Sequence, residues 1–113
     1  MSERDIKLLL EDILDSLNKI ELYTSDLSFE DYEIDSKTKD AVERNFEIIG
    51  EASSRISNDY KIQNPIVEWR ILKDFRNFII HEYFGINNQI VWDTIKFRLP
   101  DLKQDILKLI NHY

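Results

Sequence analysis

Residues 6–20 read IKLLLEDILDSLNKI, and this stretch decides the fold class. Its apolar residues recur at steps of three and four, at Ile6, Leu9, Leu10, Ile13, Leu17 and Ile20. This spacing predicts one apolar stripe along an α-helix that packs by a single face. Ser2 is placed to cap the helix, with Asp5 three residues later. The stripe fades after Tyr23, where we expect the helix to end.

A second helix is expected from Ser36, taken as its cap, to Ile56. Its inner face would consist of Ala41, Val42, Asn45, Phe46, Ile49, Ala52, Ser53 and Ile56. Gly50 lies in the middle of this helix, where glycine costs about 1 kcal/mol relative to alanine. We therefore expect a neighbouring helix to approach closely there and offset that cost. Residues 24–35 should connect the two helices, with a short helical turn opening at Ser28.

Two further helical regions follow. Asn64 and Pro65 suit an N-cap and a first helical position, which predicts a helix over 66–84, with a break allowed near Arg70, ended by Gly85. A last helical region follows Asn87, and Pro100 should kink or restart it. No alternating strand pattern and no internal repeat is present. The sequence therefore predicts an all-α bundle of four to five helices, forming a single domain over residues 1–113.

Composition narrows the class of protein. With 113 residues, 42% of them apolar, the chain can bury the core of one domain. The absence of cysteine excludes disulfides, cysteine-ligated zinc and thiol catalysis. No apolar run approaches the ~20 residues of a membrane span, and the acidic, polar start does not resemble a signal peptide. We therefore expect a cytoplasmic protein with no membrane association.

The net charge of −7 is unevenly placed. Residues 1–40 hold 12 acidic and 5 basic side chains, whereas residues 41–113 hold 10 of each. Non-specific nucleic-acid binding depends on clustered basic side chains, so a coating protein is excluded, while a local phosphate site is still allowed. The acidic segment is expected to be solvated, with docking of a basic partner as the alternative.

Several kinds of catalytic site are also absent. The chain has no glycine-rich phosphate loop, no G-x-S-x-G elbow and no H-E-x-x-H zinc motif. His81 and His112 lie far apart in the sequence, and the acids of the first helix lack a Glu-x-x-His partner for a di-iron site. We expect neither a metal nor a cofactor.

One constellation could carry chemistry, the stretch DFRNFIIHEY at residues 74–83. On a helix, Arg76 and Tyr83 fall on nearly one line, and Asn77 and His81 on another. The opposite arc, expected to face the core, carries Phe75, Phe78 and Ile79. Arginine binds phosphate, histidine moves protons near neutral pH, and an asparagine four residues away could orient the imidazole. These groups suit phosphodiester cleavage without a metal.

A structural interpretation of the same residues stays open. A histidine beside aromatics near a helix end is more often buried or capping than catalytic, and an Arg-Asn pair on a polar face is usually only solvated. Arg76 and His81 are also five residues apart, so they do not share one helix line. A symmetric homodimer would resolve this, because two copies of the helix could line one cleft.

The pattern Arg76-x4-His81-x-Tyr83, with Asn77 after the arginine, resembles the R-x4-H-x-Y signature of HEPN domains, and most closely that of HepT-like toxins. Other stretches fit the same family: AVERNFEIIGEA at 41–52, PIVEW at 65–69, FGI at 84–86, and VW at 91–92 followed by LP at 99–100. The resemblance therefore extends over nearly the whole chain in the expected order.

The resemblance implies an all-α homodimer whose motif helices line a shared cleft, and a metal-independent endoribonuclease acting on RNA. It implies that Arg76 and His81 are the catalytic pair and that Asn77 supports them. It further implies a toxin–antitoxin system in which Tyr83 is modified with AMP (AMPylation) by an MntA-like nucleotidyltransferase antitoxin, which silences the toxin.

Two alternatives remain: a non-catalytic helical binding or substrate-recognition subunit of a minimal nucleotidyltransferase, and a plain dimeric bundle without catalysis. The presence of Arg76, His81 and Tyr83 together favours the ribonuclease. Trp69 and Trp92 are expected to anchor the core or a dimer interface. Glu51 is expected to be a solvated acid rather than part of the cleft.

Overall fold

The computed structural model describes residues 1–80 and 87–113, and the side chains of these except those of residues 77–80. Within that part of the chain it contains seven α-helices, one π-helical turn and no strand. In chain order they are α1 (Glu3–Thr24), α2 (Phe29–Ile34), α3 (Ser36–Arg55), α4 (Asn58–Gln63), α5 (Trp69–Ile80), α6 (Asn88–Asp93), η2 (Thr94–Arg98) and α7 (Leu99–Ile110). The predicted all-α class is confirmed.

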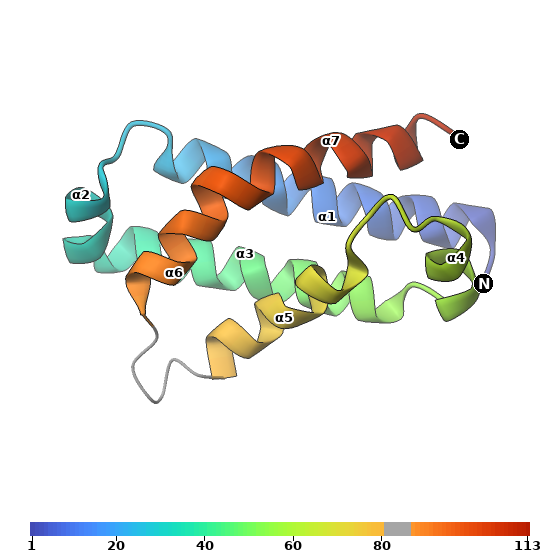
Figure 1. The fold of residues 1–113 in the computed structure, drawn as a ribbon, viewed down its shortest axis with the longest axis horizontal. Coiled ribbons are helices and arrows are strands. Elements are labelled where there is room, and N and C mark those ends of the chain that lie inside the picture. The colour runs from blue at the N-terminus through green and yellow to red at the C-terminus, as the bar shows by residue number, and fades with distance from the viewer. Residues whose placement is uncertain (81–86) are drawn as a thin grey trace.

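The long helices form a bundle around one apolar core (Figure 1). α1 packs against α3 on one side and α7 on the other, and α5 packs against α3. The apolar stripes of α1 and α3 face each other, as their spacing predicts. Among the most deeply buried side chains are Leu10, Ile13, Ile20, Val42, Phe46, Ile49, Leu72, Phe75 and Ile106. The short helices α2 and α4 lie at opposite ends of this bundle (Figure 1).

Most of the predicted helix starts are confirmed, and two are wrong. Ser2 accepts a hydrogen bond from the Asp5 backbone N–H, at 3.1 Å. Ser28 and Asp31 form a reciprocal capping box at the start of α2. The prediction that Ser36 caps α3 is wrong, because Asp35 holds that position and accepts from both the backbone N–H and the hydroxyl of Thr38, at 3.0 and 2.6 Å. These bonds to the carboxylate lower the pKa of Asp35.

The predicted start of the motif helix is also wrong. α5 begins at Trp69 rather than Ile66, and no break occurs near Arg70. Asn64 ends the unpredicted helix α4 instead of capping α5, because its Nδ2 donates to the Tyr60 carbonyl at 2.9 Å. The Trp69 indole N–H donates to the Asn64 carbonyl at 3.0 Å, and this bond stabilises the turn between α4 and α5. Trp69 is thus a half-buried anchor, packed edge-on against the Tyr60 ring.

The chain from Asn88 to Ile110 is one helical stretch with a defect just before Pro100. At η2 the Leu99 N–H donates to the Thr94 carbonyl, five residues back. Proline has no N–H and clashes with the carbonyl four residues earlier, so an α-helical ladder cannot pass this point unchanged. The predicted restart at Pro100 is confirmed, and Asn87 caps α6 as expected.

The helix α2, which lies in the acidic first third of the chain, packs onto α6 through aromatic rings. Tyr32 of α2 is fully buried, with its ring centroid 5.3 Å from that of Trp92 on α6, and Phe29 lies 6.3 Å from the same ring. Trp92 is 9% exposed and so is a core anchor. The acidic side chains of α2 point to solvent, as expected, but α2 contacts the helix that follows the motif segment.

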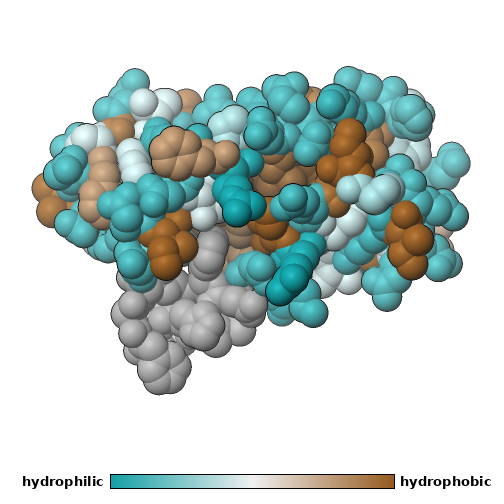
Figure 2. Space-filling model, in the orientation of Figure 1, coloured by the Kyte–Doolittle hydropathy of each residue, from teal (hydrophilic) through white to brown (hydrophobic). Residues whose placement is uncertain are grey.

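The outer surface is mostly hydrophilic, and hydrophobic groups show as separate patches on the face in Figure 2. Among the described helices, none combines the length and the apolar character needed to cross a membrane. The predicted homodimer stays a prediction.

Candidate active site

Arg76 lies on the outer face of α5, and its side chain is 49% exposed. The preceding residue, Phe75, is 1% exposed and packs edge-on against Phe46 of α3, with ring centroids 4.8 Å apart. The predicted division of this helix into a core face at Phe75 and a polar face at Arg76 is therefore confirmed. The core contact fixes the rotation of α5 about its axis, and this directs Arg76 outward.

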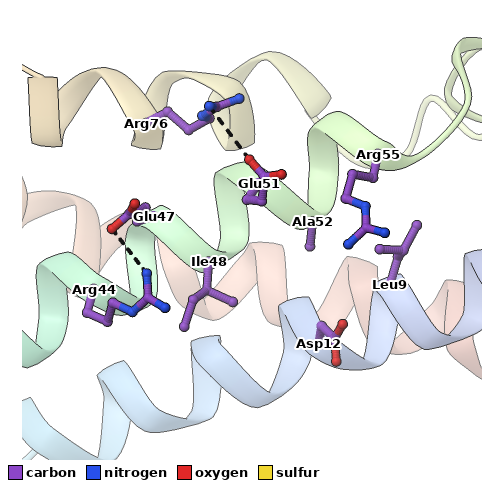
Figure 3. A pocket seen from close by; sticks show the side chains of 9 residues that line it. All are labelled: Leu9, Asp12, Arg44, Glu47, Ile48, Glu51, Ala52, Arg55 and Arg76. Atoms are coloured by element: carbon purple, nitrogen blue, oxygen red, sulfur yellow. Dashed lines mark hydrogen bonds and ion pairs between the residues drawn. The ribbon is translucent and has the colours of Figure 1, made fainter.

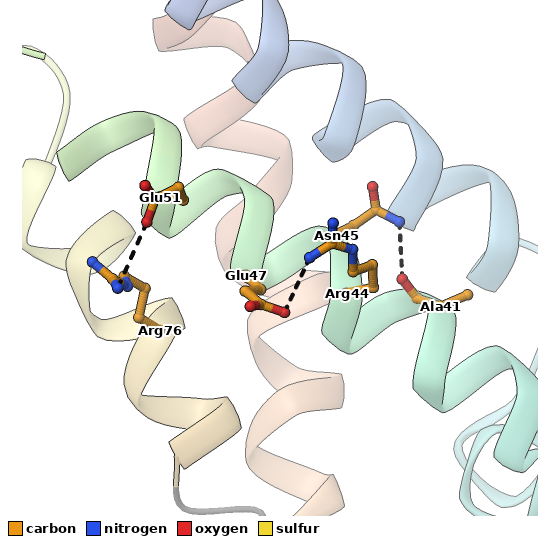
Figure 4. A network of polar contacts seen from close by, with 6 residues as sticks. All are labelled: Ala41, Arg44, Asn45, Glu47, Glu51 and Arg76. Carbon is orange, nitrogen blue, oxygen red and sulfur yellow. Dashed lines mark hydrogen bonds and ion pairs between the residues drawn. The ribbon is translucent and has the colours of Figure 1, made fainter. Parts of the chain in front are cut away.

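Glu51 of α3 faces the Arg76 guanidinium across the two helices (Figure 4). An Arg76 terminal nitrogen lies 3.6 Å from Glu51 Oε2, and the Glu51 side chain is 57% exposed. Glu51 is exposed, as expected of a solvated acid, but it pairs with the motif arginine and lines the same groove, which favours the alternative that it belongs to the site. An exposed pair of this kind contributes about 0.2–1 kcal/mol, so an incoming phosphate can displace it.

Gly50 lies directly beneath the aliphatic part of Arg76. A Cβ added at Gly50 would overlap the Cγ of Arg76 and come within 3.0 Å of its Cδ. The close helix approach predicted at Gly50 is therefore confirmed. The approaching group is the stem of the motif arginine.

A groove of about 390 Å³ runs over the outer face of α3, between α1 and α5 (Figure 3). Arg76 lines it together with two other arginines, Arg44 and Arg55. Its remaining lining consists of Leu9, Asp12, Glu47, Ile48, Glu51 and Ala52. Three basic and three acidic side chains therefore share a partly apolar floor.

The two other arginines differ in their surroundings. Arg44 pairs with Glu47 one turn along α3, at 3.3 Å. Arg55, in the last turn of α3, has no carboxylate within 4.0 Å among the described residues. Neither arginine was predicted as a site residue, because the helical periodicity was used only to assign the inner face of this helix. The steps 44, 48, 51, 55 would have revealed a second, outer face.

Three predicted site residues cannot be placed. His81 and Tyr83 lie outside the described residues, and so does the Asn77 side chain, although the Asn77 backbone belongs to α5. His112 lines a different pocket, with Tyr60 and Tyr113. In that pocket burial and the nearby Tyr113 hydroxyl raise the pKa of Tyr60. Among residues 1–80 and 87–113, no three histidine or carboxylate side chains are grouped as metal ligands would be.

The order of these features along the chain can be compared with known proteins. The family described as Ribonuclease HepT-like matches residues 13–109, which include α3, α5, the motif and α6. The chain belongs to the HepT-like ribonuclease family. The predicted family is thereby confirmed.

Individual HepT-like proteins agree over almost their full length. A protein of Thermococcus cleftensis named "Probable ribonuclease HepT" is 43% identical over 107 residues, which covers 95% of this chain and 97% of the relative. "Putative RNase MJ1380" of Methanocaldococcus jannaschii is 39% identical over 94% of this chain and 97% of its own length. A second protein of that organism, "Putative RNase MJ0127", is 36% identical over 97% and 91%. No solved structure matches the chain.

Proposed function

We propose that this HepT-like protein is a metal-independent endoribonuclease that works as a homodimer, with Arg76 and His81 as its catalytic pair. The observation that carries the proposal is the placement of Arg76. A half-exposed guanidinium stands at the edge of a groove, backed by a buried phenylalanine, in a chain of a ribonuclease family. The names of the relatives support ribonuclease activity at this site.

In the proposed reaction the RNA supplies its own nucleophile. The 2′-hydroxyl attacks the adjacent phosphorus, forming the O2′–P bond and breaking the P–O5′ bond, so the products are a cyclic phosphate and a 5′-hydroxyl. His81 moves the proton, as base toward the 2′-oxygen or as acid toward the leaving 5′-oxygen. Arg76 holds the phosphate and stabilises the charge that develops on its oxygens. Asn77 supports the pair.

The groove beside Arg76 offers a path for the strand next to the scissile phosphate. Arg44 and Arg55 are eleven residues apart on α3, which places their backbones roughly 16 Å apart along the helix axis. The groove extends over the part of α3 between them, and Arg76 reaches it from α5 (Figure 3). A phosphate bound by Arg55 would not have to displace any of the carboxylates in residues 1–80 and 87–113 first.

For regulation, we propose a toxin–antitoxin system with an MntA-like nucleotidyltransferase as the antitoxin. Tyr83 follows Arg76 by seven residues, the spacing at which a helical sequence returns to the same face. AMP attached to the Tyr83 hydroxyl would bring an anionic phosphate to the face that carries Arg76 and compete with RNA for it. We also propose that the chain forms a single HEPN-like domain and acts in the cytoplasm.

The first experiment is an RNA cleavage assay in EDTA with the wild type and an Arg76→Ala/His81→Ala double variant. Intact mass, measured beforehand, excludes a sample already modified at Tyr83, and light scattering gives the oligomeric state. Cleavage by the wild type alone is the expected result. No cleavage by an unmodified, dimeric wild type would overturn the proposal in favour of a binding subunit for a nucleotidyltransferase.

The proposed modification has its own test. Incubation with ATP and the nucleotidyltransferase should add the mass of AMP to the wild type and not to Tyr83→Phe. The modified wild type should lose cleavage. If Tyr83→Phe still gains the mass, the modified residue lies elsewhere.

A further inference from the structure

The contact between α3 and α5 has a gap where a side chain would normally stand. Gly50 is buried in the middle of the 20-residue helix α3. The Arg76 side chain fills the space above it, because a Cβ at Gly50 would overlap Arg76 Cγ and stand 3.3 Å from Arg76 Cβ. The arginine stem therefore crosses α3 at the only kind of residue that leaves room for it.

The overlap cannot be relieved by a small movement of the arginine tip. Cγ is one rotatable bond from the α5 backbone, so relief needs either a new χ1 rotamer or a wider separation of the two helices. Separation is opposed by the adjacent core, where Phe46 and Phe75 pack at 4.8 Å and are each 1% exposed. An alanine at position 50 would thus turn Arg76 away, and the helices would move only by the few tenths of an ångström that the 3.3 Å contact with Arg76 Cβ requires.

The residue after the gap acts on the other end of the same side chain. Glu51 stands 3.6 Å from the Arg76 guanidinium, so α3 passes under the stem at one residue and faces the charged head at the next. Both contacts come from neighbouring residues of a single helix. The contact at Gly50 sets the direction of the stem, and the exposed Glu51 ion pair meets the charged head at its end.

We propose that Gly50 is a positioning residue for Arg76: its missing side chain lets the arginine reach the groove in the orientation that phosphate binding needs. The proposal rests on the proposed function for its consequence in catalysis, but its structural part does not depend on any activity. Glycine lowers helix stability relative to alanine, and the placement of Arg76 explains why a glycine occupies this position.

A double-mutant cycle on stability tests the structural part. In an Arg76→Ala background the overlapping Cγ and Cδ are gone, so Gly50→Ala should raise Tm by about 2–6 °C through its better helix propensity. In the wild type the same substitution should leave Tm unchanged or lower it, because the overlap cancels the gain. An equal rise in both backgrounds would overturn the proposal.

Cleavage of RNA in EDTA tests the functional part. Gly50→Ala should lower kcat/KM at least tenfold while circular dichroism and oligomeric state stay those of the wild type. Ser54→Ala is the matched control, since this exposed serine lies one turn along α3 and its hydroxyl donates to the Glu51 carbonyl. The control should keep wild-type cleavage and shift Tm equally in both backgrounds.

The two proposals fail differently. A wild type that cleaves no RNA contradicts the proposed function, whereas the Tm cycle can still be measured and still decides the role of Gly50. A Gly50→Ala variant that cleaves at the wild-type rate contradicts the positioning role and leaves the nuclease intact.

Discussion

The outer edge of the contact between α3 and α5 is packed differently from the contact between α2 and α6. Between α2 and α6 large rings fill the space, since Phe29 and Tyr32 pack onto Trp92. At the outer edge of the α3–α5 contact a glycine leaves space, and the side chain that enters it is an arginine with a half-exposed head. The α2–α6 contact buries Tyr32 and Trp92, whereas the outer edge of the α3–α5 contact presents Arg76 to solvent.

This difference separates scaffold from candidate site. Burying aromatic rings stabilises the fold by removing apolar area from water, so residues chosen only for stability should resemble the α2–α6 contact. A glycine that makes room for a charged, half-exposed side chain contributes little to stability. Its presence is explained if the position of that charge matters for binding.

The largest expected effect concerns the catalytic pair. Arg76→Ala and His81→Ala should each lower RNA cleavage by about 10²–10⁴-fold. Arg76→Ala should leave Tm within a few degrees of the wild type, because the core residue beside it is Phe75. Cleavage assays and thermal unfolding on the same samples check both statements. A large fall of Tm in Arg76→Ala would show that Arg76 contributes to stability as the buried rings do, which contradicts the proposed difference between the two contacts.

The opposite behaviour is expected at the aromatic contact. Trp92→Ala should lower the free energy of unfolding by about 3–5 kcal/mol, because it empties a site filled by a buried indole. Urea denaturation measures this loss, and Ile90→Ala on the same helix, where the side chain is 53% exposed, should change it by no more than about 0.5 kcal/mol. Near-normal stability of Trp92→Ala would show that α2 is not held as described.

A smaller effect is expected at the groove. Arg55→Ala should weaken binding of single-stranded RNA by about 3- to 10-fold at low salt and reduce the salt dependence by about 0.7 of a logarithmic unit per unit of log salt. Arg98→Ala removes the same charge from an arginine beside Glu68, outside this groove, and serves as the control. Equal losses in both variants would show only a general charge effect.

The smallest effect is expected at the carboxylate that faces Arg76. Glu51→Gln removes the partner that a phosphate must displace, so RNA should bind up to about fivefold more tightly, the equivalent of an exposed ion pair. Fluorescence anisotropy with labelled RNA resolves a change of this size. Weaker binding would show that Glu51 holds the guanidinium in place more than it competes for it.

Local sequence signals predicted most of the helices and failed at the cap of α3, at the unpredicted helix α4 and at the start of α5. The stripes of α1 and α3 and the caps Ser2, Ser28 and Asn87 depend on residues a few positions apart, and they are confirmed. The start of α5 depends on Trp69 reaching back to the Asn64 carbonyl and on the packing of its ring. Asn64-Pro65 gave a plausible local signal that these contacts override.

The sequence predicts that Arg76 lies on a polar face of its helix, next to the core residue Phe75, because helical periodicity assigns each residue a direction. It also determined the family, because the motif and its flanking stretches occur in a fixed order. Which residues of α3 meet that arginine follows only from the way the helices pack. Periodicity within one helix does not specify which turn of a neighbouring helix packs against it, so Gly50 and Glu51 were matched to Arg76 by the packing of the core.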